Sequence, residues 1–273
     1  MTIAYFDCFS GISGDMILGA LVDAGLDFDR LREELAKLPV AGYRVERRRV
    51  KKHEIAATKV DVLVETPDGY ALADVIEHEH PHHHHDHDHA HDHPHPHAHA
   101  HGPARRLGEI LEVIERSGLD PAVRQRAAAI FDRLAAAEAA MHGTTKDTVL
   151  LHEVSGLDAL IDIVGACIGL HLLSIEEVYA SALPVGSGFV RCAHGRMPVP
   201  APGALELLRG TPVYQTQTRG EVVTPTGAAI ITTVANEFGP MPRMVLDRVG
   251  YGAGTKDFAE HPNLLRVCIG QKG

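Results

Sequence analysis

The feature that most constrains the fold of this chain is an internal stretch made almost entirely of histidine, aspartate, proline and alanine. It runs from His78 to Gly102, reads HEHPHHHHDHDHAHDHPHPHAHAHG, and holds fourteen of the chain's twenty histidines. So few apolar side chains cannot offset the conformational entropy that ordering would cost. We therefore expect residues 78–103 to be a disordered insertion, and residues 1–77 and 104–273 to form one domain around it.

Imidazole and carboxylate side chains alternate along this insertion, and both bind metals. Neutral imidazole suits Ni²⁺, Cu²⁺ and Zn²⁺, and the interspersed aspartates add oxygen donors. A flexible loop cannot impose one geometry, so its affinities should follow the Irving–Williams order. A solvated low-complexity linker is the alternative; a purification tag fits poorly, because the tract is internal and mixed. The predicted metal-binding residues are His82, His83, His84, His85, His87, His89, His91, His93, His95, His97, His99 and His101.

Composition and charge exclude several functional classes. The chain has 273 residues with 45% hydrophobic content, which is enough to bury a substantial core. Its formal charge of −10 at pH 7 argues against binding to nucleic acid or to an anionic membrane. Four separated cysteines without a CxxC pair predict reduced thiols, and no apolar run approaches the ~20 residues of a membrane span. We therefore expect a cytoplasmic protein without a nucleic-acid or membrane partner.

The first segment predicts a strand, a loop and a helix. Residues 3–6 form the strand, the helix runs from about Met16 to Ala24, and Gly25 ends it. The segments YRVERRRVKK and AATKVDVLVETP alternate apolar and polar residues, which predicts an antiparallel pair that turns near His53–Glu54. We expect order to decay after Pro67.

Helical periodicity resumes at residue 105. A helix over about 107–114 and a second one that begins at Asp120–Pro121 predict a helical hairpin packed on the sheet. GLDALIDIVGACIGLHLL predicts a third long helix, and IEEVYASALPV predicts a strand. Helical pieces (APGALELLRG, PTGAAIITTVANEFG) then alternate with strand-like ones (PRMVLDRVGYG, NLLRVCIG). The predicted fold class is α+β, or mixed α/β, in a single domain.

The loop DCFSGISGD, between the first strand and the first helix, is a candidate site. Backbone amides and a helix N-terminus favour an anion there, so that a phosphate or carboxylate is one interpretation. Helix capping by Ser13 or Asp15, with glycines that allow the turn, is the other interpretation. Asp7 and Cys8 are also a candidate metal-binding pair.

The segment LHEVSGLDALIDIVG adds His152, Glu153, Asp158 and Asp162. The two aspartates are four residues apart and share a helix face. Glu153 and the aspartates are candidate ligands or bases, but carboxylates on helices are usually solvated, and we favour that interpretation. His171 is half a turn out of phase with Asp162 and is not predicted to join them.

Three further motifs carry candidate residues. CAHGRMPVPAP holds Cys192 and His194, which suit one soft or borderline metal ion. EVVTPTGAAI places Thr224 at a helix N-cap, which indicates either an anion site or capping alone. GYGAGTKD lacks the Gly-Lys-[Ser/Thr] order of a Walker A motif, although a looser glycine loop can still bring Lys256 to a phosphate.

Six segments of the chain, taken in order, resemble the nickel-insertion proteins of the LarC family. They are YFDCFSGISGDM, the histidine tract, HEV…D…DIVG, HGRMPVPAPGALELLRG, TPTGAAI and GYGAGTKDF…PNLLRV. The resemblance spans nearly the whole chain. It implies a lyase-type nickel cyclometallase that inserts Ni²⁺ into pyridinium-3,5-bisthiocarboxylic acid mononucleotide and forms a carbon–nickel bond flanked by sulfur ligands. It also implies CTP hydrolysis with Mg²⁺ or Mn²⁺, and a lactate racemase-type apoenzyme that receives the nickel-pincer cofactor.

The resemblance also implies roles for the candidate residues. The tract, with Cys192 and His194, would bind nickel. The helix starts and glycine loops would bind the nucleotide, through Ser10, Gly11, Ser13, Gly14, Thr224, Thr226, Gly227 and Lys256. The residues that would pass the ion on, or accept the ring proton that nickel displaces, are Asp7, Cys8, Asp15, His152, Glu153 and Asp158.

Two departures from the family pattern shape the prediction. The family's CTP site is attributed to a C-terminal domain, whereas this sequence stops at VCIGQKG, so we do not expect this chain alone to bind CTP; a truncated first half of a longer protein, or a separately encoded half that works with a partner chain, are the two alternatives. The family's HFHEVGAxDS reads LLHEVSGLDA here, which keeps His152, Glu153 and Asp158. The competing interpretations are a non-catalytic nickel metallochaperone or storage protein, and a hydrolase of small phosphorylated molecules. A homo-oligomer is compatible with each of them.

Overall fold

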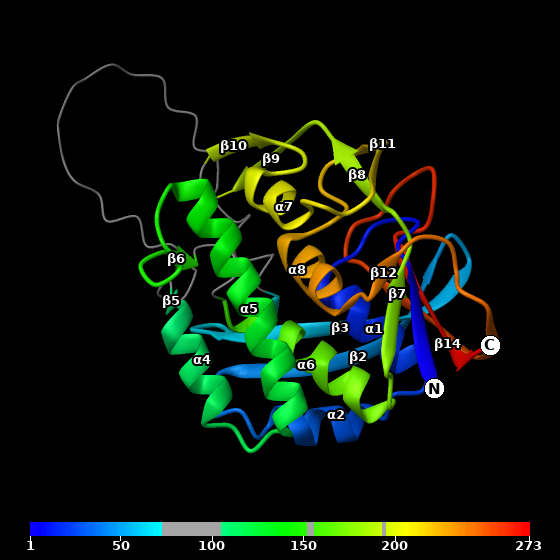
Figure 1. Ribbon diagram of the computed structural model, residues 1–273, viewed down its shortest axis with the longest axis horizontal. Helices are drawn as coiled ribbons and strands as arrows, with labels where there is room; N and C mark the ends of the chain where they lie inside the picture. The colour runs from blue at the N-terminus through cyan, green and yellow to red at the C-terminus, as the bar shows by residue number, and fades with distance from the viewer. Residues whose placement is uncertain (73–104, 152–155, 193–194) are drawn as a thin grey trace.

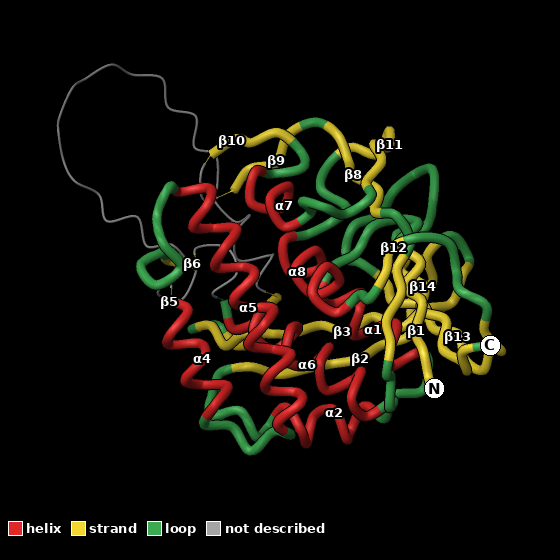
Figure 2. The backbone as a smooth tube through the Cα atoms, viewed as in Figure 1, coloured by secondary structure: helices red, strands yellow, loops and turns green. Residues whose placement is uncertain are grey.

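The computed structural model describes residues 1–72, 105–151, 156–192 and 195–273, and within these ranges the fold is mixed α/β, as predicted. Figure 2 shows the helices gathered in the middle of the molecule, with strands of the main sheet at one side. The histidine tract lies outside the described residues. No helix within the described ranges is both long and apolar enough to cross a bilayer.

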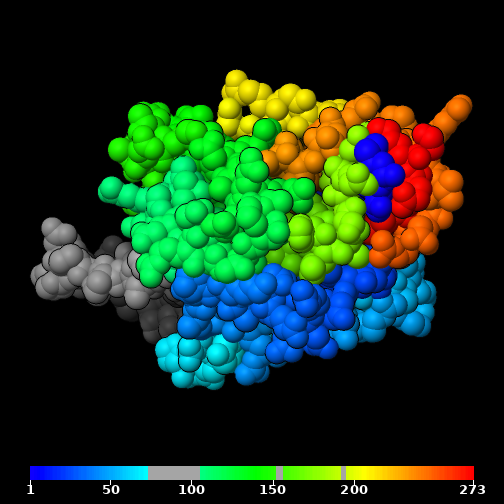
Figure 3. Space-filling model, turned by 60° about the horizontal axis from the view of Figure 1, so that its bottom comes forward, coloured from blue at the N-terminus to red at the C-terminus, as the bar shows by residue number. Residues whose placement is uncertain are grey.

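The main sheet joins strands that are far apart in the sequence. Its order is β12 (Glu237–Phe238), β7 (Glu177–Ala180), β1 (Thr2–Asp7), β14 (Leu264–Lys272), β13 (Met244–Ala253), β3 (Ile55–Thr66) and β2 (Tyr43–Lys52), and β4 (Gly69–Leu72) pairs with β3. Strand β1 is antiparallel to β14 and parallel to β7. The first and last strands are therefore neighbours, as the blue and red surfaces in Figure 3 show.

The predicted antiparallel pair is confirmed, and so is its turn. Strands β2 and β3 pair from Tyr43↔Val64 to Lys52↔Ile55. The two turn residues, His53 and Glu54, have φ of 48° and 64°, as a two-residue hairpin turn of type I′ requires. The expected loss of order after Pro67 is wrong, because the chain turns there and returns as β4 along the free edge of β3.

Smaller sheets lie beside the main one. Strand β8 (Leu183–Ser187) is parallel to β11 (Val213–Arg219), β9 (Phe189–Cys192) is antiparallel to β10 (Gly195–Pro198), and β5 (Arg105–Arg106) pairs with β6 (Leu150–Leu151). The single strand predicted for IEEVYASALPV is wrong. The chain breaks at Ser181, because Ser181 N donates to the Phe6 carbonyl as β7 ends, and β8 then pairs elsewhere.

The predicted helices are confirmed. They are α1 (Gly14–Asp23), α4 (Leu107–Glu115), α5 (Pro121–His142), α6 (Leu157–Leu172), α7 (Pro202–Leu207) and α8 (Pro225–Val234). Helix α2 (Phe28–Leu35) was not predicted. Helix α1 contacts β13 and β3, and α6 packs on α1. The expectation that the hairpin of α4 and α5 packs on the sheet is wrong for α5, which contacts α4, α6, α7 and α8 (Figure 1). Since α1 and α6 already cover the sheet, α5 forms a further layer outside them.

Helix α1 is in direct backbone contact with β13. A Cβ atom added at Gly252 would lie 1.8 Å from the carbonyl oxygen of Met16, and one added at Gly250 would lie 2.1 Å from that of Ala20. Gly19, on the helix, meets the Thr58 carbonyl of β3 in the same way, at 2.4 Å. Only glycine fits at these three positions, so the glycines of GYGAGTKD that lie on β13 are explained by packing.

We predict that Gly252→Ala destabilises the protein, because the added methyl group collides with helix backbone that cannot rotate away. Over-packing of this kind costs roughly 1–3 kcal/mol, and the upper end is expected here. Gly108→Ala is the control: nothing lies within 4 Å of its added Cβ in α4. It should leave stability unchanged or raise it by up to about 1 kcal/mol. Urea unfolding measures both, and equal stability of the two variants would contradict the packing argument.

Candidate functional site

The two loops predicted to bind an anion lie against each other. Ile12 N donates to the Val222 carbonyl at 2.9 Å, and Thr224 N donates to the Ile12 carbonyl at 3.1 Å. The starts of α1 and α8 therefore meet at one place in the fold. The predicted N-cap is confirmed, since Thr224 Oγ1 accepts from Gly227 N at 3.1 Å. Thr226 follows in the first turn of α8 and is half-buried.

Close packing accounts for the glycines of these loops. An added Cβ would lie 1.9 Å from the Val222 carbonyl oxygen at Gly11, where φ is +109°. At Gly227 it would lie 2.4 Å from the Ile12 carbonyl oxygen, and at Gly14 it would lie 2.3 Å from Asp162 Oδ2. The glycines thus bring the helix starts together, and their presence does not by itself indicate a bound phosphate.

The first turn of α1 is occupied by a carboxylate of its own. Ser13 is the N-cap residue by position, but its hydroxyl donates to Asp15 Oδ1 instead of capping the helix. The same Asp15 oxygen accepts from Met16 N at 2.8 Å. Ser10, one turn earlier in the loop, is buried, and its hydroxyl has no hydrogen-bond partner among the described residues.

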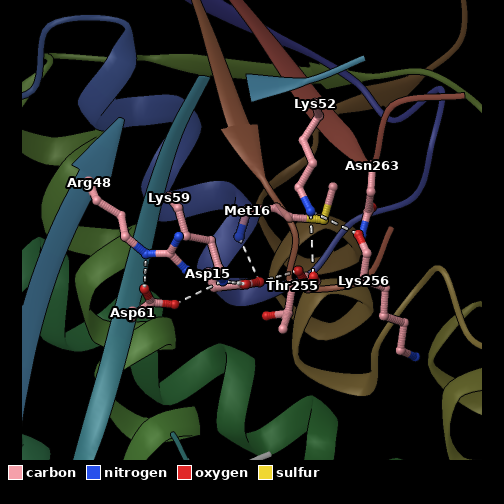
Figure 4. A network of polar contacts seen from close by, with 10 residues as sticks. Asp15, Met16, Arg48, Lys52, Lys59, Asp61, Thr255, Lys256 and Asn263 are labelled. Carbon is pink, nitrogen blue, oxygen red and sulfur yellow. Dashed lines mark hydrogen bonds and ion pairs between the residues drawn. The ribbon is translucent and has the colours of Figure 1, made fainter. Parts of the chain in front are cut away.

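A buried lysine links this turn to β3. Lys59 Nζ donates to Asp15 Oδ2 and lies 3.2 Å from Asp61 Oδ1, while Arg48 Nε donates to Asp61 Oδ2 at 3.1 Å (Figure 4). We call Asp15, Lys59, Asp61 and Arg48 the Lys59 cluster. The side chains of Lys59 and Asp61 are 4% and 9% exposed, whereas that of Asp15 is 22% exposed. Asp15 is therefore the carboxylate that a ligand can reach.

The carboxylates of the Lys59 cluster stabilise the protonated form of Lys59. Burial alone would lower the pKa of Lys59, but the charges and hydrogen bonds of Asp15 and Asp61 outweigh it and raise the pKa above its ordinary value. The lysine therefore carries its proton throughout the physiological pH range. Its positive charge lies beside the positive end of the α1 dipole, and both attract negative charge to this turn.

Of the two aspartates predicted on one helix face, Asp162 is the one that reaches the start of α1, where its carboxylate packs against Gly14. Asp158 lies in the first turn of α6 beside Gly156, the N-cap residue of that helix. Both side chains have interaction partners. The interpretation of Asp162 as a merely solvated carboxylate is wrong, because the contact with Gly14 packs it between two helices.

Asp7 and Cys8 do not form an open metal-binding pair. Asp7 accepts from Arg266 Nη2, so that its carboxylate is already in an ion pair. Cys8 is fully buried, its thiol lies 3.8 Å from the Phe6 carbonyl oxygen, and burial raises the pKa of that thiol far above its ordinary value. A neutral buried thiol is a poor metal ligand. The described residues contain no group of three or more His, Cys, Asp or Glu side chains placed to bind a metal.

Lys256 lies close to the joined loops but outside the Lys59 cluster. Its ammonium donates to the Glu221 carbonyl at 3.3 Å, and in Figure 4 its side chain points away from Asp15. Lys52 Nζ donates to the Lys256 carbonyl at 3.1 Å, and Asn263 Nδ2 donates to the same oxygen at 3.0 Å. These bonds fix the backbone of the loop after β13 and leave the Lys256 side chain at the surface.

Several candidate residues lie outside the described part of the chain. They are the histidines of the tract, His152, Glu153 and His194. Cys192 ends strand β9, but its side chain is not among those described. The roles predicted for all of these residues stay predictions.

Sequence reasoning missed Lys59 and Asp61, although a signal was available. The segment AATKVDVLVE is a strongly apolar strand that carries a lysine and an aspartate two residues apart, on the same face. Charged residues inside such a strand are rarely buried unless they are paired. The missing information was the partner, because Asp15 lies 44 residues earlier in the chain.

We predict that Lys59→Met destabilises the protein by about 3–5 kcal/mol, because it leaves the largely buried Asp15 carboxylate without its cation and leaves the buried Asp61 with Arg48 alone. Lys37→Met is the matched control, since Lys37 pairs with Glu34 on the surface of α2 and is 41% exposed. Its loss should cost at most about 1 kcal/mol. Chemical unfolding compares the two variants, and a Lys59→Met cost no larger than that of Lys37→Met would show that the cluster contributes little.

Comparisons with known proteins agree with the order of motifs. A protein-family model described as nickel insertion protein matches residues 4–273. The protein of Desulfitobacterium hafniense named pyridinium-3,5-bisthiocarboxylic acid mononucleotide nickel insertion protein is 46% identical over 99% of this chain and 59% of its own length. The protein of that name from Geobacillus kaustophilus is 43% identical over 100% of this chain and 60% of its own length.

No solved structure is significantly similar to this chain. The chain spans 59–62% of the length of the curated relatives it matches. The family match covers nearly every residue, and the relatives exceed 40% identity along the whole chain. The chain therefore belongs to the nickel insertion protein family.

Proposed function

We propose that this chain inserts Ni²⁺ into pyridinium-3,5-bisthiocarboxylic acid mononucleotide. The observation that carries this proposal is the 46% identity, over 99% of the chain, to a relative named for that reaction. CTP with Mg²⁺ or Mn²⁺ enters the proposal as a co-substrate of a second domain or partner chain, and a lactate racemase-type apoenzyme enters as the recipient of the product.

The reaction replaces a ring proton of the substrate by nickel. A carbon–hydrogen bond breaks, a carbon–nickel bond forms, and the proton leaves to a base, so that no oxidant or reductant is consumed. We assign the base to Asp15, since it is the most exposed carboxylate of the Lys59 cluster and accepts a hydrogen bond from Ser13. Lys59 forms an ion pair with this carboxylate and holds it in place.

Nickel reaches this site through weaker ligands in our proposal. The histidine tract collects the ion from solution, and His152, Glu153, Asp158, Cys192 and His194 pass it toward the substrate. Asp158 is half-buried at the start of α6, the helix whose Asp162 packs against the first turn of α1. This contact supports a hand-over that ends near Asp15.

A second candidate function is a nickel metallochaperone that delivers ions without catalysing insertion. The observation in its favour is that the described residues contain no group of three or more potential metal ligands. Such a protein would bind nickel through its tract and would need no base. Formation of the nickel-pincer product distinguishes the two functions.

We predict that Asp15→Asn lowers the rate of nickel insertion by about 10²–10⁴-fold, the usual contribution of a general base. The assay incubates the protein with Ni²⁺ and the mononucleotide, with and without CTP and Mg²⁺, and follows the product by absorption and mass. Asp29→Asn, an exposed acid in the first turn of α2, should keep the wild-type rate. An unchanged rate for Asp15→Asn would show that Asp15 is not the base. If the wild type binds nickel but forms no product, the metallochaperone function is favoured.

We predict that nickel binding by the tract is lost as the solution becomes acidic. Imidazole must be deprotonated to bind a metal, and its unperturbed pKa is about 6.5, so that most sites should be empty at pH 5 and available at pH 7.5. Isothermal titration with Ni²⁺ at both pH values measures the stoichiometry. A variant that lacks residues 80–101 should lose most of the sites at pH 7.5. The same stoichiometry at both pH values, or in this variant, would assign nickel binding to another part of the chain.

A further inference from the structure

An open groove rich in arginine lies between the β9–β10 hairpin and the end of β11. Its lining includes Arg191, Arg196 and Arg219, together with Phe189 and two glycines, Gly188 and Gly220. We call it the arginine groove. No acidic residue lines it, and among the described residues no carboxylate lies within ion-pair distance of the three guanidinium groups.

Two of these arginines are held in an unfavourable pairing. Arg191 and Arg196 are direct Cα partners in the antiparallel β9–β10 ladder, so that their side chains leave the ribbon on the same face. Like charges placed directly opposite each other destabilise a strand pair. The fold therefore bears a repulsion that a bound anion would convert into an attraction.

The guanidinium groups are attached to well-fixed backbone. The Arg196 guanidinium lies over the Phe189 ring, 4.4 Å from its centroid, which limits its rotation. Arg219 is paired with Ser187 at the end of β11, and the next residue, Gly220, donates from its N–H to the Ser187 carbonyl at 2.9 Å. Guanidinium groups suit the bidentate binding of phosphate, and that of Arg196 is already oriented by the Phe189 ring.

The start of α1 is, by contrast, unfavourable for a phosphate. Asp15 occupies the first turn, Asp162 packs against Gly14, and the glycines of the loop are filled by neighbouring backbone. A phosphate dianion would meet two carboxylates there. The arginine groove offers three cations and no carboxylate, so electrostatics separate the two sites clearly.

The arginine groove is joined by a short stretch of backbone to the loop that precedes the Lys59 cluster. Arg219 is three residues from Val222, and the Val222 carbonyl accepts from Ile12, in the loop that leads to Asp15. Because consecutive Cα atoms are 3.8 Å apart, the Cα atoms of Arg219 and Val222 are separated by at most about 11 Å. Arg219 is therefore within about 11 Å of the residue that bonds to the loop before α1.

We infer that the arginine groove binds the phosphate group of the pyridinium mononucleotide substrate. This inference rests on the proposed function, since it assigns a place to one part of that substrate. The inferred phosphate site is therefore the arginine groove and not the glycine loops predicted from the sequence. It gives the three arginines a binding role that the sequence did not suggest.

Direct binding tests the groove without any nickel chemistry. The probes are nicotinic acid mononucleotide, which has the same ribose phosphate on a pyridinium ring, its dephosphorylated riboside, and CTP. We expect the wild type to bind the mononucleotide at least tenfold more tightly than the riboside. Arg191→Gln and Arg219→Gln should each weaken mononucleotide binding by about tenfold or more and leave riboside binding unchanged. Arg209→Gln, an exposed arginine paired with Glu206, should bind like the wild type.

The thermal stability of the ligand-free protein provides a second readout. Arg191→Gln should keep or raise the melting temperature, because it removes the repulsion with Arg196. If this variant is stable but does not bind the mononucleotide, the loss of binding is not caused by a folding defect. Equal affinity of the Gln variants and the wild type for the mononucleotide would overturn the inference. The inference would also be overturned if the arginine substitutions weakened the binding of CTP but not the binding of the mononucleotide.

The insertion assay separates this inference from the proposed function. If the arginines prove necessary for mononucleotide binding but no nickel product forms, the groove stands and the proposed function fails. If the wild type forms the product and the Gln variants keep its KM and kcat, the proposed function stands and the groove assignment fails.

Discussion

The contact of helix α1 with glycine-bearing backbone on both sides is the constraint on which the rest of the structure depends. Gly250 and Gly252 of β13 let the helix approach until backbone atoms touch, and Gly11 and Gly227 do the same for the loops at its start. A side chain at any of these positions would push α1 away from the sheet. The separation of Asp15 from Lys59, and of α1 from α8, is therefore set by backbone contact and not by adjustable side chains.

This rigidity makes the buried charges of the Lys59 cluster tolerable. Three ion pairs in a largely buried setting repay their desolvation only where the geometry is well defined, because a misplaced partner leaves a charge without compensation. Lys59 is attached to β3, and Asp15 is attached to the helix that β3 and β13 hold. The cluster thus exists because the sheet and the helix cannot slide past each other. The 22% exposure of Asp15 leaves one polar edge of it open to a ligand.

Local signals were sufficient to predict most elements but not the site. Apolar periodicity and the stop at Gly25 gave α1 correctly, since Leu26 N donates to the Leu21 carbonyl as in a glycine-terminated helix. The Lys59–Asp15 contact joins residues 44 positions apart, which no short window contains, and the Arg191–Arg196 pairing depends on the register of a hairpin that was not predicted. The glycines of GYGAGTKD show the reverse error: a pattern that suggested a phosphate loop is explained, on β13, by a helix lying against it.

The two sites differ in net charge: three arginines line the arginine groove, whereas Lys59 and Arg48 balance the two aspartates of the Lys59 cluster. Carboxylates gather at the start of α1, whereas arginines gather in the arginine groove, and residues 219–222 join the two along one stretch of backbone. A preformed cage of strong ligands would compete with the sulfur atoms of the substrate for nickel, and the described residues contain no such cage. In the proposed reaction the protein thus fixes the nucleotide and the base at a set spacing, and the sulfur atoms of the substrate draw the ion away from weaker imidazole and carboxylate ligands. Nickel then moves from the imidazole and carboxylate ligands to the softer sulfur atoms of the substrate, and the contribution of the fold is to position the nucleotide and the base.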